Sequence, residues 1–234
     1  MTRLLILVEG QTEEVFVRDT LAPHLASFGV YVERPSLVWT KRLPHGGEHR
    51  GGVSNWAMIH KDLLRLLNDT DANVTTMLDL YGLPADFHGE DVLSRLGAKD
   101  VHVDGYSVVE ELEKRFAVEI GNERFIPFLT LFEFEALVFS SPMEIANHFE
   151  SPKLESAIQN IVDAAKSPEL INGSESTHPK KRLMHLFEKQ NHSYKPANDG
   201  PTILQKIGIQ TIRDACPHFN AWITRLESLG VARQ

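Results

Sequence analysis

Two acidic residues follow directly on apolar segments of the chain. Residues 3–8 (RLLILV) form an apolar run that ends at Glu9, and residues 73–80 (NVTTMLDL) contain a second run that is closed by Asp79. A carboxylate that closes a buried segment is unfavourable unless it is paired or binds a metal. A hard divalent cation takes one or two carboxylates together with water and substrate phosphate. We therefore predict that Glu9 and Asp79 bind Mg²⁺ or Mn²⁺ and are catalytic.

A further group of acids follows the apolar residues 125–132 (FIPFLTLF). Glu133 and Glu135 come directly after this segment and are predicted as additional metal ligands. They would face the same side in a strand but diverge by roughly 200° in a helix. Because a change from strand to helix is expected here, Glu135 is slightly favoured; the alternative is one exposed acid and one acid at a helix start. Glu13 would either join the site or only interact with a helix dipole.

Basic residues occur in two places that could contact a phosphate backbone. The glycine-rich loop 41–52 (KRLPHGGEHRGG) could approach phosphate closely, although it could equally be an ordinary surface loop. A second cluster, from Pro179 to Arg182, begins a helix and could be only a solvated face. The predicted substrate-binding residues are Arg42, His45, His49, Arg50 and Lys180. Lys181 or Arg182 would offset charge in the transition state, and both are predicted as catalytic residues.

Strands and helices must alternate if these residues are to meet. We expect strands at residues 3–8, 30–38, 73–79 and 125–131, and helices at residues 55–67 and 106–119. Such alternation predicts a parallel sheet, with 3–8 and 73–79 adjacent and ligands bound beyond the carboxyl ends of the strands. Pro35 places the segment 30–38 at an edge or a bulge. The predicted fold class is α/β, a mainly parallel sheet flanked by helices.

The second part of the chain has a different pattern. Ser141, Pro142 and Glu144 form a strong helix start, with serine as N-cap, proline at the first helical position and glutamate at the third. Only helical spacing and turns follow. We expect an α/β domain over residues 1–141 and a helical C-terminal extension over residues 142–234 that packs on it.

The composition excludes several classes of protein. The chain has 24 basic and 32 acidic residues, a net charge of −8, which argues against a protein that coats nucleic acid. It does not exclude an enzyme that gathers carboxylates around metal ions. The only cysteine, Cys216, excludes an internal disulfide and a cysteine-rich zinc site. Neither a signal segment nor an apolar run of membrane-helix length is evident, so a cytoplasmic location without membrane contact is expected.

Short motifs along the chain resemble a known family. VEGQTEE and DLYG look like the two acidic motifs of the TOPRIM domain, which topoisomerases, bacterial primases and OLD-type nucleases share. The full set, with FEFEALVFS, PELIN, HPKKR and IGIQTIRDACPHFNAW, resembles a bacterial family of that superfamily, domain of unknown function 4276. The resemblance implies a TOPRIM-like (Rossmann-like) sheet, Mg²⁺ binding, a nuclease role and a partner ATPase in phage defence.

Two positions depart from the pattern that this resemblance implies. The superfamily has Asp-x-Asp in its second motif, where this chain has Tyr81 at the second acidic position. The family often has histidine before Glu-Phe-Glu, where this chain has Phe132. Tyr81 favours an alternative to catalysis, in which a TOPRIM-like scaffold has lost part of its ligand set and serves as a regulatory or binding subunit.

The motifs together predict a Mg²⁺-dependent nuclease of the TOPRIM type that acts on nucleic acid. The chain has no GxxxxGK[ST] motif, so ATP hydrolysis would have to come from a partner. A third alternative is a helix-turn-helix that reads DNA, formed by residues 203–212 around Gly208. Few basic residues in its second helix argue against that alternative.

Overall fold

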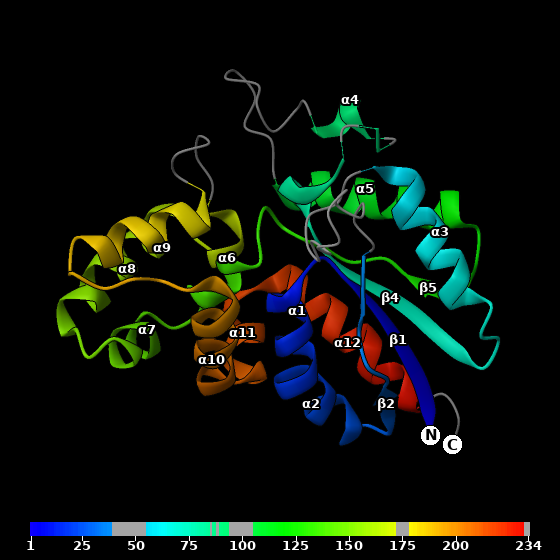
Figure 1. The fold of residues 1–234 in the computed structure, drawn as a ribbon, viewed down its shortest axis with the longest axis horizontal. Helices are drawn as coiled ribbons and strands as arrows, with labels where there is room; N and C mark the ends of the chain where they lie inside the picture. Colours follow the sequence, from blue (N-terminus) through cyan, green and yellow to red (C-terminus); the bar gives the residue numbers. More distant parts are fainter. Residues whose placement is uncertain (39–54, 85, 88, 94–104, 172–177, 232–234) are drawn as a thin grey trace, which may run out of the picture.

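A six-stranded parallel sheet forms the centre of the protein (Figure 1). The computed structural model describes residues 1–38, 55–84, 86–87, 89–93, 105–171 and 178–231. The main strand order is β2-β1-β4-β5, with β3 paired to β1 and β6 paired to β4. The strands are β1 (Thr2–Val8), β2 (Val30–Val32), β3 (Ser36–Leu37), β4 (Ala72–Asp79), β5 (Phe125–Ile126) and β6 (Leu129–Thr130). Every pairing is parallel, which confirms the predicted fold class.

The two strands that end in acids are neighbours, as predicted. β1 and β4 pair from Arg3 opposite Ala72 to Val8 opposite Met77. The amide of Glu9 then donates to the carbonyl oxygen of Met77 at 3.2 Å, one residue beyond the last pair. Because both strands run in the same direction, their acids emerge at the same edge of the sheet.

Prolines divide the other two expected strands. The segment 30–38 is not one strand but two short ones, β2 and β3, which both pair with β1 on either side of Pro35. The segment 125–131 is likewise divided into β5 and β6, with Pro127 between them. Proline lacks the amide hydrogen that a ladder needs, so each strand must pause there. The predicted edge position of the segment 30–38 is confirmed, because β2 is the last strand in the order.

Helices cover both faces of the sheet. They are α1 (Gln11–Phe16), α2 (Ala22–Ala26), α3 (Trp56–Leu67), α4 (Glu90–Leu93), α5 (Gly105–Ile120), α6 (Glu135–Val138), α7 (Pro142–His148), α8 (Pro152–Ala165), α9 (Pro179–Glu188), α10 (Pro196–Ile207), α11 (Ile209–Ala215) and α12 (Pro217–Val231). A π-helical segment, Val17–Leu21, joins α1 to α2. Leu4 and Ile6 of β1 share one core with α1 and α12, whereas Leu5 and Leu7 share another with α3 and α5. This alternation is what a strand buried on both faces requires.

The part of the chain after residue 141 is helical, as expected. The Ser141 hydroxyl accepts from the amide of Glu144 at 3.3 Å and so caps α7. Within the described part of this region there is no strand. Figure 1 shows α7 to α11 gathered on one side of the sheet, while α12 returns to lie against it. The indole of Trp222 on α12 donates to the Thr75 hydroxyl of β4 at 3.0 Å.

A buried carboxylate fixes the start of α12. Glu169 accepts from the amides of His218 and Phe219 at 3.0 and 2.9 Å, which satisfies donors in the first turn of that helix. The His218 ring lies 3.0 Å from Glu113 of α5. Glu169 of the PELIN motif is therefore hydrogen-bonded to His218 and Phe219, which lie in the last of the motifs, IGIQTIRDACPHFNAW. The division at residue 141 stays a prediction, and one core cluster contains residues from both sides of it.

Within the described ranges, no helix combines the length and the apolar character that crossing a bilayer requires.

Candidate functional site

The Glu9 carboxylate meets the backbone of Asp79 where β1 and β4 end. The amide of Asp79 donates to Glu9 Oε2 at 3.1 Å, so the two acidic residues are in direct contact. Glu9 and Asp79 are each partly buried. The two residues that the sequence singled out first are thus brought together by adjacent parallel strands.

A tight turn after β6 holds the Asp79 carboxylate in place. Phe132 has a left-handed backbone, with φ of 66°, and its carbonyl oxygen accepts from the amide of Tyr81 at 3.1 Å. The amide of Phe134 then donates to Asp79 Oδ1 at 2.8 Å. Positive φ is unfavourable for a bulky residue and tends to occur at functional sites. The DLYG and FEFE motifs are therefore joined into one structure around Asp79.

The change from strand to helix expected at the FEFE motif is present. Glu135 is the first residue of α6 and is 4% exposed, whereas Glu133 lies in the turn before it. Glu133 Oε2 accepts from the amide of Lys180 at 3.0 Å and lies 2.7 Å from His178 Nδ1. The charges of both glutamates act on Asp79, so the structure brings both residues to the cluster.

Glu13 is also part of this acidic cluster. It lies in the first turn of α1, is 5% exposed, and its Oε2 accepts from the amide of Gly10 at 2.9 Å. The sequence left two roles open for Glu13: it could join the acidic site, or it could only interact with the helix dipole. Burial beside Glu9 and Glu135 argues for membership of the site, because an acid that only favoured the dipole would be stable in water.

Electrostatics disfavour the ionised form of this cluster. Burial raises the pKa of Glu13 to about 7 and that of Glu135 to about 7, and the charge of Glu9 adds to both shifts. Burial, followed by the charges of Glu9 and Glu13, holds the pKa of Asp79 well above its usual range. Burial also raises the pKa of Glu9. The fully ionised cluster would therefore have an excess of negative charge, which a bound cation would relieve.

Lys180 brings a positive charge to the acids. Its Nζ lies 3.9 Å from Glu135 Oε1, and its charge lowers the pKa of both Glu9 and Glu135. Lys181, one residue later on α9, is exposed, and the amide of Arg182 donates to the His178 carbonyl at 3.0 Å. The catalytic roles of Lys181 and Arg182 stay predictions, as does substrate binding by Lys180. Arg42, His45, His49 and Arg50 lie outside the described residues.

Two residues near the acids were not found from the sequence. His178 directly precedes α9 and contacts Glu133, although the HPKKR motif had drawn attention only to its basic residues. Tyr194 is buried, and the charges of Glu135, Glu133 and Glu13 act on its hydroxyl. The position of His178 directly before Pro-Lys-Lys was a signal that could have identified it. No local pattern marks Tyr194.

The donor chemistry of the cluster fits a divalent cation. Glu9, Asp79 and Glu13 each have one oxygen fixed by a backbone amide. Among the residues that the structure describes, no three His, Cys, Asp or Glu side chains already converge as a ligand set. Carboxylate oxygens are hard, negatively charged ligands, and Mg²⁺ and Mn²⁺ prefer such ligands. The residues fit the ion by chemistry, and side-chain rotation would have to complete the geometry.

The structure gives little support to the helix-turn-helix alternative. Gly208 does separate α10 from α11, with φ of 78°. However, Ile209 and Ile212 of α11 are buried, and Arg213 binds Glu227 of α12 at 2.6 Å. The basic residue of the second helix is thus engaged within the protein.

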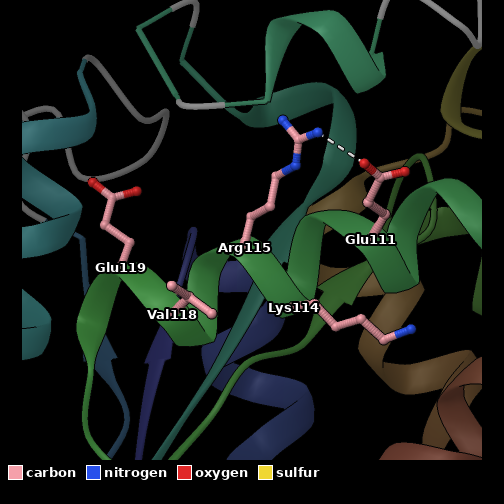
Figure 2. Close-up of a pocket in the computed structure, with 5 residues that line it drawn as sticks. All are labelled: Glu111, Lys114, Arg115, Val118 and Glu119. Atoms are coloured by element: carbon pink, nitrogen blue, oxygen red, sulfur yellow. Dashed lines mark hydrogen bonds and ion pairs between the residues drawn. The ribbon is translucent and has the colours of Figure 1, made fainter.

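A separate hollow lies on the outer side of α5 (Figure 2). Its volume is about 540 Å³, and Figure 2 shows that its lining residues all belong to α5: Glu111, Lys114, Arg115, Val118 and Glu119. Arg115 binds Glu111 at 2.8 Å and Asp91 at 2.7 Å. None of the clustered acids lines this hollow.

Comparisons with known proteins give one family and solved structures of two OLD proteins. A family model described as "Domain of unknown function (DUF4276)" matches residues 8–227. The C-terminal region of the Xanthomonas campestris pv. campestris OLD protein is 14% identical, with a TM-score of 0.42 and coverage of 100% of this chain and 99% of that one. The C-terminal region of the Burkholderia pseudomallei OLD protein is 17% identical, with a TM-score of 0.44 and coverage of 98% and 99%. No curated protein matches the chain.

Proposed function

The chain belongs to the DUF4276 family, and we propose that its acidic cluster makes it a metal-dependent enzyme of the TOPRIM type that cleaves phosphodiester bonds in nucleic acid. The observation that carries this proposal is the contact between Glu9 and Asp79 at the ends of two adjacent parallel strands. Their burial beside Glu13 and Glu135 is unfavourable without a compensating charge. A bound Mg²⁺ or Mn²⁺ would supply that charge.

Each residue of the cluster has a separate role in this proposal. Glu9 and Asp79 would hold the cation, with Glu135 and Glu133 as the further oxygen donors. The amides of Asp79 and Phe134 orient the first two carboxylates, so that little reorganisation is needed. When bound, such an ion would polarise the scissile phosphate and lower the pKa of attacking water. Lys180 balances the charge of Glu135 and would bind the substrate phosphate.

The alternative is a scaffold that binds partners without catalysis. Tyr81 supports it, because this ring takes the place of a second aspartate and is 46% exposed. The absence of a converged ligand set among the described residues also supports it. The retained acids support the enzyme, since a scaffold has no use for buried carboxylates that repel each other.

The motif resemblance extends the proposal to partners and setting. It supports a cytoplasmic nuclease that acts in phage defence with an ATPase. The 234 residues contain no P-loop motif, so the nucleotide-hydrolysing site would lie outside them. Co-purification of an ATPase with the tagged protein from its native host would test this part.

Cleavage assays test the enzymatic proposal directly. We expect Mn²⁺-dependent cleavage of single- or double-stranded DNA, or of RNA, by the wild-type protein, alone or with the ATPase. Asp79→Asn should reduce the rate by at least about 100-fold, because it removes a ligand of the ion that stabilises the transition state. Glu155→Gln, which alters an exposed acid of α8, should have no effect. Equal cleavage by Asp79→Asn and wild type would contradict the proposal.

Gly82 offers a second test, because its lack of a side chain makes room for Glu9. A Cβ atom at residue 82 would overlap the Glu9 carboxylate. Gly82→Ala should therefore displace Glu9 and weaken Mn²⁺ binding by about 10-fold or more, as measured by calorimetry. Gly121→Ala is the control: its φ of 61° makes alanine strained, but it lies before β5, at the opposite end of the sheet. Unchanged Mn²⁺ affinity in Gly82→Ala would argue against Glu9 as a ligand.

A further inference from the structure

The hydroxyl of Tyr194 is buried without a hydrogen-bond partner in the described part of the chain. The residue is only 6% exposed. Burial of an unsatisfied hydroxyl is unfavourable, and such a group in a native protein calls for an explanation. Tyr106 provides the contrast, because its hydroxyl donates to Ser167 Oγ at 2.9 Å.

A glycine inside a helix makes room for this hydroxyl. Gly200 lies within α10, where glycine is a poor helix former. A Cβ atom at residue 200 would lie 2.9 Å from the Tyr194 hydroxyl oxygen, closer than normal packing permits. Two locally unfavourable features, the unsatisfied hydroxyl and the helical glycine, therefore coincide at one point.

This point lies between two segments that carry acids of the cluster. The same Cβ position is 3.4 Å from Phe134 Cε1 and 3.8 Å from Thr12 Cγ2. Phe134 directly precedes Glu135, and Thr12 directly precedes Glu13. Burial, and then the negative charge of Glu135, raises the pKa of Tyr194 well above its usual range. The hydroxyl therefore keeps its proton and can act as a hydrogen-bond donor toward the acids.

We propose that Tyr194 is a positioning residue of the carboxylate site, whose hydroxyl donates a hydrogen bond to the Glu135 carboxylate when the site binds a divalent cation. This inference rests on the proposed function. A carboxylate has two oxygens, so one can face the cation while the other accepts from the phenol. Such outer hydrogen bonds orient metal ligands, and their loss typically weakens metal affinity 10- to 100-fold.

Tyr194→Phe separates this role from a structural one. In the cation-free protein, loss of an unsatisfied hydroxyl should leave the melting temperature unchanged or raise it by up to about 4 °C. In calorimetry with Mn²⁺ alone, the same variant should show a dissociation constant about 10- to 100-fold higher than wild type. The change in tyrosine absorption on adding Mn²⁺ should also be smaller in this variant. A structural role would instead lower the melting temperature and leave the affinity unchanged.

Tyr106→Phe is the matched control. It removes a hydroxyl that has a partner, so it should lower the melting temperature and leave Mn²⁺ affinity unchanged. Gly200→Ala should weaken Mn²⁺ binding in the wild-type background, because the new methyl group displaces the hydroxyl. In the Tyr194→Phe background it should cause no further loss, since the two changes act on the same group.

The outcomes distinguish the inference from the proposed function. If the wild type binds Mn²⁺ and Tyr194→Phe binds it equally well, the positioning role is wrong and the metal site stands. A Tyr194→Phe variant that loses both Mn²⁺ affinity and as much thermal stability as Tyr106→Phe would also overturn the role. If the wild type binds neither Mn²⁺ nor Mg²⁺, the proposed function fails and the inference fails with it.

Discussion

Mg²⁺ or Mn²⁺ is expected to raise the melting temperature of the wild-type protein, and Glu9→Gln or Asp79→Asn is expected to abolish that rise. Carboxylates at neighbouring strand ends repel each other and lose hydration, as the raised pKa values of Asp79 and Glu9 indicate. A cation that binds only the folded state stabilises it by about 2.7 kcal/mol at 100 times its dissociation constant. For a chain of this size that corresponds to a shift of roughly 5–10 °C.

The variants themselves provide a second signature. Without a cation, Glu9→Gln and Asp79→Asn should be as stable as the wild type or more stable, because each removes a repelling charge. Glu13→Gln should reduce the cation-dependent shift less, and Glu155→Gln, an exposed acid on α8, should leave it intact. The measurement is differential scanning calorimetry with and without 5–10 mM cation, roughly a saturating amount for a typical Mg²⁺ site. Absence of any shift in the wild type would favour the scaffold alternative.

The cation-free protein should lose stability as the pH rises from about 4.5 to about 7. Burial raises the pKa of Glu13 and Glu135 to about 7, above the ordinary value of 4.5 that both regain on unfolding. Between these values the folded state binds more protons than the unfolded state, so increasing pH favours unfolding. For Glu135 the difference corresponds to about 3 kcal/mol, fully present below the lower value and lost above the upper one.

Urea unfolding at pH 5 and pH 7.5 measures this effect. Glu135→Gln, which cannot ionise, should flatten the pH dependence over this interval by about 2 kcal/mol, and saturating Mn²⁺ should reduce it in the wild type. Burial lowers the pKa of His218, but its hydrogen bond with Glu113 and the charges of Glu113 and Glu169 together outweigh this and raise it overall, so His218 contributes with the same sign. The difference between wild type and Glu135→Gln therefore isolates the glutamate. Identical pH profiles for the two proteins would show that folding does not raise the pKa of Glu135.

The primary structure alone determined the elements that carry the first two acids. A continuous apolar run suits a strand covered on both faces, so β1 and β4 could be located to within a residue or two. Parallel neighbours place their carboxyl ends together, which made the meeting of Glu9 and Asp79 predictable. The capped start of α7 was equally clear, because Ser141 and Pro142 act within a single turn. Pro127 should have signalled the break between β5 and β6, since proline cannot pair in a ladder.

Only the tertiary structure decided which side chains complete the cluster. Consecutive residues of a helix point about 100° apart, so the order Lys180-Lys181-Arg182 could not show which base would face the acids; the packing of α9 selects Lys180. Glu13 is buried because α10 packs against α1, although 180 residues separate them in the chain. The hydroxyl of Tyr194 lies close to Gly200 of α10, beside Phe134 and Thr12, although no local pattern marks its segment. Local periodicity specifies strands and caps, whereas contacts between distant helices depend on how their faces pack, which no short segment encodes.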